Sequence, residues 1–390
     1  GLVVGGASAI FAGCIKAATE YRDTHNWIFM LLPVAGVLIV FMYEKIGRQD
    51  GGTNQVLATI KSKDDVPFLS APLIFVSTLL THLTGGSAGR EGASIQFGGS
   101  IGNWLGKLAH LDEFDHHVMI MCGMSAAFAA VFGTPMAAAV FAMEVVSVGV
   151  MYYAALLPCV IAAIIAAEFA TGMGIDPETF PVHSIPGLTV ESGLKMALIA
   201  VGCGILSILF CILLKTVGQL YAKYLKNPYI RIVVAAGVII LITICLNTKD
   251  YMGAGSGLIA RAIEKGEARP LDFLWKMLLT ALTMRAGYRG GEIVPAFSIG
   301  ATFGCVAGGI LGFSPELAAA ASMVALFCGV TNCPITAMLI SFELFGFSGA
   351  AYYLIAISIS YAVSGYYSLY KDQTIVYSKY KARYINRKTR

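Results

Sequence analysis

The chain of 390 residues is poor in charge, because Lys, Arg, Asp and Glu together make up only 13% of it. Soluble domains carry about 25% charged residues, so this chain has too few to cover the surface of a soluble protein of its size. Hydrophobic residues reach 57%, and the mean hydropathy is +0.74. The composition excludes most soluble enzyme folds and specific nucleic-acid binding, and it predicts a polytopic protein in a lipid bilayer.

Motifs for metal, redox or hydrolytic chemistry are also missing. None of the nine cysteines forms a C-x-x-C pair, no histidine stands at metal-ligand spacing from a cysteine, and there is no HExxH motif. We therefore expect buried structural thiols, no cofactor and no enzyme activity. An intramembrane enzyme using Glu91 and Glu292 as paired carboxylates is the alternative from another class.

The net charge of +4 is partly local, because seven Lys and Arg residues crowd the last twenty positions. By the positive-inside rule this tail is cytoplasmic, and nucleic-acid binding by it is the weaker alternative. The tail is too short to be a folded regulatory domain. The chain begins at Gly1 inside an apolar run without the pattern of a cleavable signal peptide, so we expect further residues before it in the full protein.

Apolar segments recur from end to end: residues 2–16, 27–43, 67–84, 95–108, 118–148, 151–171, 194–217, 232–246, 271–286, 296–311, 317–347 and 350–370. Several are shorter than the about 20 residues that a straight span needs. Two are much longer and contain a proline, Pro135 or Pro334. Short or broken helices at membrane depth are tolerated only where they line a cavity or pack within protein. The pattern therefore favours a transporter or channel over a simple receptor bundle.

An internal repeat links the two halves of the chain. Residues 134–144 resemble residues 333–343, and their prolines and their terminal Glu144 and Glu343 are each 199 positions apart. Residues 89–92 resemble residues 290–292, with the glutamates 201 positions apart. Repeats with a site at their interface are typical of secondary transporters. We expect Glu144 and Glu343 to cap neighbouring backbone. The expected units are a first membrane repeat at 1–180, a second at 181–370, a basic tail at 371–390, and a Pro- and Gly-rich connector at 172–186.

The first of three glycine-rich breaks, residues 85–93, precedes an apolar helix. Such a break directs free N–H groups and the positive end of the helix dipole at one point, which suits an anion. Glu91 is itself an anion at this break. Ionised, it can occupy the site, and protonated, it can leave, so that it links proton uptake to anion passage. The simpler alternative is a structural ion pair between Glu91 and Arg90.

The second break, residues 290–295, has Pro295 where a first helical turn tolerates it. The N–H groups of Ile293 and Val294 then face an anion, and Glu292 is either a second proton-handling carboxylate or a charge that merely favours the helix dipole. In the third break, residues 51–55, Thr53 and Asn54 offer a hydroxyl and an amide to an ion, or form an ordinary helix cap.

Two other groups of side chains leave alternatives open. His82, near the first break, is a candidate proton relay, although a hydrogen-bonded histidine between helices is the simpler interpretation. A tyrosine cluster after the last apolar segment, formed by Tyr366, Tyr367 and Tyr370, is either an interfacial belt or the source of a hydroxyl that donates to an anion.

These breaks resemble the three signatures of the CLC family of anion channels and proton-coupled anion antiporters. G-R-E-G-P appears as residues 89–93, G-G-x-F-x-P as 290–295, and G-S-G-I-P in altered form as 52–56. The resemblance implies an all-α fold of two inverted-topology repeats with broken and tilted helices, an anion pathway in each subunit, and a homodimer in the bacterial plasma membrane. It makes Glu91 the gating glutamate. The expected anion-binding residues are Thr53, Asn54, Gly89, Arg90, Gly92, Ile293, Val294 and Tyr367.

Three departures from the chloride-type pattern resemble the bacterial fluoride/proton antiporters of that family. Glu292 replaces an apolar residue, Val145 stands where chloride/proton exchangers carry an internal proton-transfer glutamate, and the first signature is altered. In contrast, the fluoride branch often has Met or Asn at the position of Thr53 and Thr at that of Val294. A small, strongly hydrated ion such as fluoride needs many short hydrogen bonds to replace its water, and backbone N–H groups supply them.

We therefore predict a proton-coupled fluoride antiporter that exports fluoride from the cytoplasm, with Glu91 and Glu292 in gating and proton transfer. A chloride channel or chloride/proton antiporter of the same fold is the alternative. A cation transporter is disfavoured, because it would present carboxylate clusters and helix C-termini to the ion.

Overall fold

A computed structural model describes residues 1–46, 52–60, 66–381 and 383–389. Gly51 of the third break, Arg390 of the tail and part of the expected loop at 44–65 lie outside the described residues. Within the described part there are sixteen α-helices, and seven helical segments are long and apolar enough to cross a membrane. The prediction of a helical, polytopic chain is confirmed.

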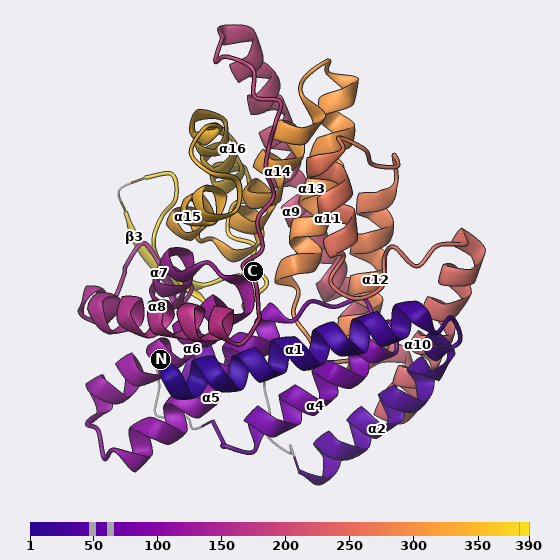
Figure 1. The fold of residues 1–390 in the computed structure, drawn as a ribbon, viewed down its shortest axis with the longest axis vertical. Coiled ribbons are helices and arrows are strands. Elements are labelled where there is room, and N and C mark those ends of the chain that lie inside the picture. Colours follow the sequence, from indigo (N-terminus) through magenta and orange to yellow (C-terminus); the bar gives the residue numbers. More distant parts are fainter. Residues whose placement is uncertain (47–51, 61–65, 382, 390) are drawn as a thin grey trace.

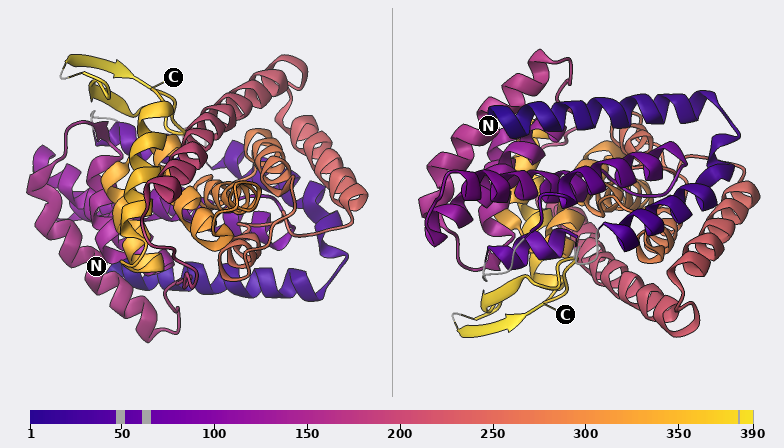
Figure 2. Two further views of the ribbon diagram at one scale, coloured as in Figure 1. Left: turned by 90° about the horizontal axis from the view of Figure 1, so that it is seen from above. Right: turned by 90° about the horizontal axis from the view of Figure 1, so that it is seen from below.

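The helices of the first half are α1 (Leu2–Thr24), α2 (Leu32–Lys45), α3 (Thr53–Thr59), α4 (Ser70–Leu83), α5 (Glu91–Leu108), α6 (Glu113–Phe132), α7 (Pro135–Glu144) and α8 (Leu156–Gly172). Those of the second half are α9 (Val190–Tyr224), α10 (Pro228–Leu246), α11 (Ser256–Glu264), α12 (Asp272–Ala286), α13 (Ile293–Ile310), α14 (Pro315–Thr331), α15 (Pro334–Phe345) and α16 (Ala350–Val363). The first half fills the lower part of Figure 1 and most of the second half lies above it, while α10 returns to pack against α2 (Figures 1 and 2). Residues 173–189 join the halves without helix or strand.

The two long apolar runs each break into two helices, as their prolines predict. Pro135 and Pro334 occupy the first turns of α7 and α15, where a missing N–H is tolerated. Gly133 and Asn332 end the preceding helices in the left-handed conformation, with φ of 71° and 60°. Each break therefore combines a proline start with a left-handed helix end.

Equivalent elements of the two repeats cap each other. The Glu144 carboxylate accepts hydrogen bonds from the N–H groups of Ile335 (3.0 Å) and Thr336 (2.8 Å) at the start of α15. The Glu343 carboxylate in turn accepts from the N–H groups of residues 136 and 137 at the start of α7 (2.8 and 2.9 Å). Both carboxylates lie at helix N-termini, which favour negative charge. Their expected role as backbone caps is confirmed.

The tail forms a small sheet that the sequence analysis did not predict. Strand β1 (Ser147–Val148) pairs parallel with β2 (Thr374–Tyr377), which pairs antiparallel with β3 (Tyr384–Lys388). The fully buried Gln373 amide donates to the carbonyl groups of Val145 (3.1 Å) and Thr331 (2.7 Å), at the ends of α7 and α14. The tail is thereby fixed to both repeats just after Tyr370.

Candidate functional site

The glycine breaks of the two repeats meet in the interior of the fold. The Gly89 N–H donates to the Gly291 carbonyl and the Gly291 N–H donates to the Gly89 carbonyl, each at 2.7 Å. This close approach requires glycine, because a Cβ on Gly291 would lie 2.5 Å from the Gly92 nitrogen. The first helical turns of α5 and α13 start beside this bridge. Gly89 therefore contributes space and a backbone link, since its N–H is already used.

The Glu91 carboxylate lies beside the bridge with no hydrogen-bond donor. The residue is 1% exposed, and among the described residues neither carboxylate oxygen has a hydrogen-bond partner. The Arg90 Nε is 3.8 Å from Glu91 Oε1, an ion pair without a hydrogen bond. A buried carboxylate without donors is costly, so this group favours either protonation or movement. Arg90 and Glu91 are thus close enough for an ion pair, but they do not form the hydrogen bonds of a structural pair.

The N-termini of α5 and α13 supply unpaired backbone donors next to this carboxylate. The first intrahelical hydrogen bonds are donated by the N–H groups of residues 94 and 296, so those of Gly92, Ile293 and Val294 lack an intrahelical acceptor. The Val294 N–H is near enough to Glu91 to interact electrostatically, but not at hydrogen-bond geometry. Two helix dipoles and several N–H groups thus converge on a place suited to an anion.

A cavity of about 140 Å³, here called the Glu292 cavity, contains several predicted site residues, including Thr53, Asn54 and Glu292. The Glu292 side chain is 22% exposed, and the Arg285 guanidinium lies 3.7 Å from its Oε1. Thr53 is not a helix cap, because its hydroxyl donates to the Gly92 carbonyl at 3.0 Å. The Asn54 amide oxygen accepts from the Lys371 N–H at 2.9 Å, which ties α3 to the tail.

The tyrosine that lines this cavity is Tyr370. Tyr367 packs instead against the apolar cluster around α9, and the Tyr366 hydroxyl pairs with that of Ser378 at 2.9 Å. Tyr370 is 4% exposed, and no described residue forms a hydrogen bond with its hydroxyl. No sequence pattern separates these tyrosines, because their directions depend on the turns that follow α16.

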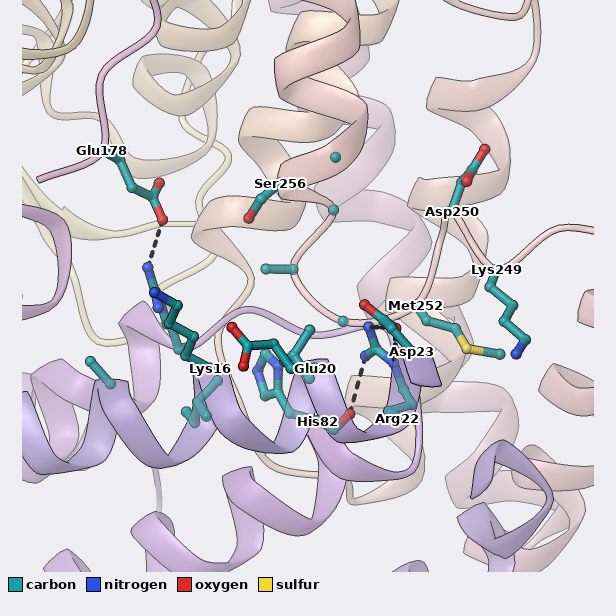
Figure 3. A pocket seen from close by; sticks show the side chains of 18 of the residues that line it. Lys16, Glu20, Arg22, Asp23, His82, Glu178, Lys249, Asp250, Met252 and Ser256 are labelled. Atoms are coloured by element: carbon teal, nitrogen blue, oxygen red, sulfur yellow. Dashed lines mark hydrogen bonds and ion pairs between the residues drawn. The ribbon is translucent and has the colours of Figure 1, made fainter. Parts of the chain in front are cut away.

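On another side of the bridge lies a cavity of about 680 Å³, here called the Arg90 cavity (Figure 3). It shares no lining residue with the Glu292 cavity. Its charged lining residues are Lys16, Arg22, Arg90, Lys249, Glu20, Asp23, Asp176, Glu178 and Asp250. His82 also lines it, is 2% exposed, and its Nε2 has no hydrogen-bond partner among the described residues. The carboxylates at least balance the cations, so this cavity is not built to trap anions.

Lys276 is a site residue that the sequence analysis missed. It is fully buried in α12, and its ammonium donates to the Ser87 hydroxyl (3.0 Å) and to the carbonyl groups of Tyr251 (3.0 Å) and Gly253 (2.7 Å). These three acceptors are neutral, so its charge favours an anion at the nearby break. The available signal was a lysine within an apolar segment, since ionisable residues at membrane depth are usually functional.

Comparisons with known proteins identify the family and the fold of the chain. The model of the voltage gated chloride channel family matches residues 35–365. A Pseudomonas syringae pv. tomato protein named "Chloride/fluoride channel protein" is 34% identical over 390 residues, covering 97% of this chain and 85% of its own. The crystal structure of a CLC-type fluoride/proton antiporter has a TM-score of 0.91 at 32% identity, covering 95% of this chain and 94% of that one. A slow cyanobacterial Cl⁻/H⁺ antiporter, with a TM-score of 0.80 over 93% and 92% of the chains at 17% identity, supports the fold alone.

Proposed function

The chain belongs to the voltage gated chloride channel (CLC) family of multi-pass membrane proteins, and from this we propose that it is a proton-coupled antiporter that exports fluoride. The observation that carries the proposal is the position of the Glu91 carboxylate. It is buried without a donor where the N-termini of α5 and α13 converge. Both the similar Pseudomonas protein and the similar antiporter of known structure carry fluoride in their names.

Exchange follows from the two states of Glu91. Ionised, the carboxylate occupies the anion place and blocks it. Protonated, it has no charge for the helix dipoles to hold, so it yields this place to an anion. Each passage of an anion then requires a proton on Glu91, which links the two fluxes.

The Glu292 cavity is the fluoride-binding side of the pathway. The Ile293 and Val294 N–H groups, the Tyr370 hydroxyl and the Asn54 side-chain NH₂ group supply short polar contacts that replace water around a small anion. The Thr53 hydroxyl joins them only when it releases the Gly92 carbonyl. Arg90 acts on this anion through its charge. The adjoining basic tail makes this side cytoplasmic by the positive-inside rule, and the Arg90 cavity is then external.

Glu292 is the second carboxylate of the mechanism. Its side chain is partly exposed in the Glu292 cavity, so it can exchange protons with cytoplasmic water. An anion held by the nearby N–H groups favours protonation of this carboxylate. Glu292 thereby keeps its proton while the site is occupied and releases it to the cytoplasmic side once the anion has left.

Each subunit is expected to consist of the repeats 1–180 and 181–370 and the tail 371–390. Two such subunits are expected to form a homodimer. Light scattering of the purified protein in detergent tests this point, with a mass of two chains as the expected result and one chain as the contrary one.

The transport proposal is tested in liposomes by recording fluoride efflux and proton uptake together. Wild type should move both. Glu91→Gln should abolish proton uptake, and Glu292→Ala should reduce it while leaving the protein folded. A Glu91→Gln protein that couples protons normally would remove Glu91 from the mechanism. Chloride flux equal to fluoride flux and without protons would favour a chloride channel.

A further inference from the structure

The connector between the repeats, residues 172–186, reaches the surroundings of the gating residue Glu91. It is seated on the break between α6 and α7, because a Cβ on Gly133 would lie 2.4 Å from the Pro177 side chain. The next residue, Glu178, lines the Arg90 cavity (Figure 3). Its Oε1 accepts a hydrogen bond from Arg90 Nη2 at 2.6 Å. A residue of the connector thus directly contacts the neighbour of Glu91.

Arg90 lies between two carboxylates and binds them unequally. It is hydrogen-bonded to Glu178 at 2.6 Å, whereas its distance to Glu91 Oε1 is 3.8 Å. Guanidinium groups favour two parallel hydrogen bonds to one carboxylate. Nothing covalent prevents Arg90 from forming such a pair with the adjacent Glu91. The contact with Glu178 holds the guanidinium in its present place.

We propose that Glu178 is a positioning residue for the gate: it holds Arg90 away from Glu91 and so sets the external pH at which Glu91 takes up its proton. The inference rests on the proposed function of Glu91. It assigns to the connector between the repeats a regulatory contact with the transport site.

The direction of the effect follows from the charges that face Glu91. Besides Arg90 and Glu178, the titratable groups are Lys276 from α12 and the Tyr370 phenol just before the tail. His82 from α4 faces Arg90 in the same cavity. Removing the Glu178 charge leaves the other groups in place, frees Arg90 to approach Glu91, and removes one repelling carboxylate. Both changes favour the ionised form of Glu91, so the gate then needs a more acidic exterior to open.

The test is the dependence of fluoride efflux on external pH, measured in liposomes with Glu178→Gln. We expect the pH of half-maximal rate to fall by about 1 unit, with the wild-type maximal rate retained at low pH, which also shows that the variant is folded. Glu178→Asp keeps the negative charge, so its pH of half-maximal rate should lie close to that of wild type. Glu20→Gln is the matched control, because Glu20 lines the same cavity and no described contact joins it to Arg90.

The route through Arg90 is tested by adding Glu178→Gln to an Arg90→Gln protein. Here the second substitution should cause only a small further shift, from the lost repulsion between Glu178 and Glu91. A further shift as large as that of Glu178→Gln alone would show that Glu178 acts only through its own charge, which would overturn the positioning role. A Glu178→Gln profile identical to wild type, or an equal shift in Glu20→Gln, would overturn it as well. A wild type without proton-coupled fluoride flux would overturn the proposed function itself, which distinguishes the two failures.

Discussion

Gly89→Ala should strongly slow transport, because the space beside Glu91 is already filled. A Cβ at this position would lie 2.3 Å from Glu91 Oε2 and 2.9 Å from Pro295 Cδ. Non-bonded atoms do not approach so closely, so the carboxylate must move by about 1 Å, and a misplacement of this size can cost about 100-fold in rate. If the backbone moves instead, the two hydrogen bonds to Gly291 weaken, each of them worth about 1 kcal/mol.

The assay is initial fluoride efflux from liposomes at fixed external pH, with proton uptake recorded alongside. We expect a loss of about 10-fold to 100-fold. Gly237→Ala in α10 is the matched control, since a Cβ there meets nothing within 4 Å. Thermal unfolding in detergent distinguishes the two causes of a loss: an unchanged unfolding temperature assigns it to the site of Glu91, and a lowered one assigns it to the fold. Wild-type flux and coupling in a folded Gly89→Ala protein would refute the placement of Glu91 at the bridge.

Three further predictions concern caps and contacts. Glu144→Ala removes three hydrogen bonds, one of them from the Thr336 hydroxyl, so it should destabilise the fold by about 3 kcal/mol, measured by denaturant unfolding in detergent; an unchanged midpoint would contradict the cap. Lys276→Met removes the buried positive charge near the break and should reduce fluoride efflux by about tenfold, whereas wild-type efflux would make Lys276 purely structural. Tyr370→Phe should raise the fluoride concentration for half-maximal efflux about tenfold, which corresponds to the loss of one hydrogen bond. Tyr367→Phe should leave this concentration unchanged, and equal effects of the two substitutions would count against the Tyr370 assignment.

The parts of this fold that depend on local chemistry could be predicted from sequence. Pro135 and Pro334 mark helix starts whatever surrounds them, and the breaks appear beside them. Repeat symmetry placed Glu144 and Glu343 at equivalent helix ends, which made their role as caps predictable. The helix starts near Glu91 likewise follow from the glycine-rich segment before them.

Contacts between distant segments could not be predicted in the same way. Glu178 and Arg90 are 88 positions apart, and only the path of the connector brings them together. Tyr370 lines the Glu292 cavity and Tyr367 does not. The turn between them is fixed by a hydrogen bond from the Asn332 amide to the Tyr367 carbonyl and by one from the Tyr370 N–H to the Ser368 hydroxyl. Lys276 is visible in the sequence, but its three acceptors come from separate loops.

Proton-coupled fluoride exchange predicts that a fluoride gradient alone drives protons across the membrane. Liposomes containing the purified protein are loaded with fluoride, diluted into fluoride-free buffer at equal pH with the membrane potential clamped, and followed for internal acidification. We expect proton uptake that stops in Glu91→Gln and is weak when chloride replaces fluoride. Fluoride efflux without proton uptake, or equal proton uptake with chloride, would contradict it.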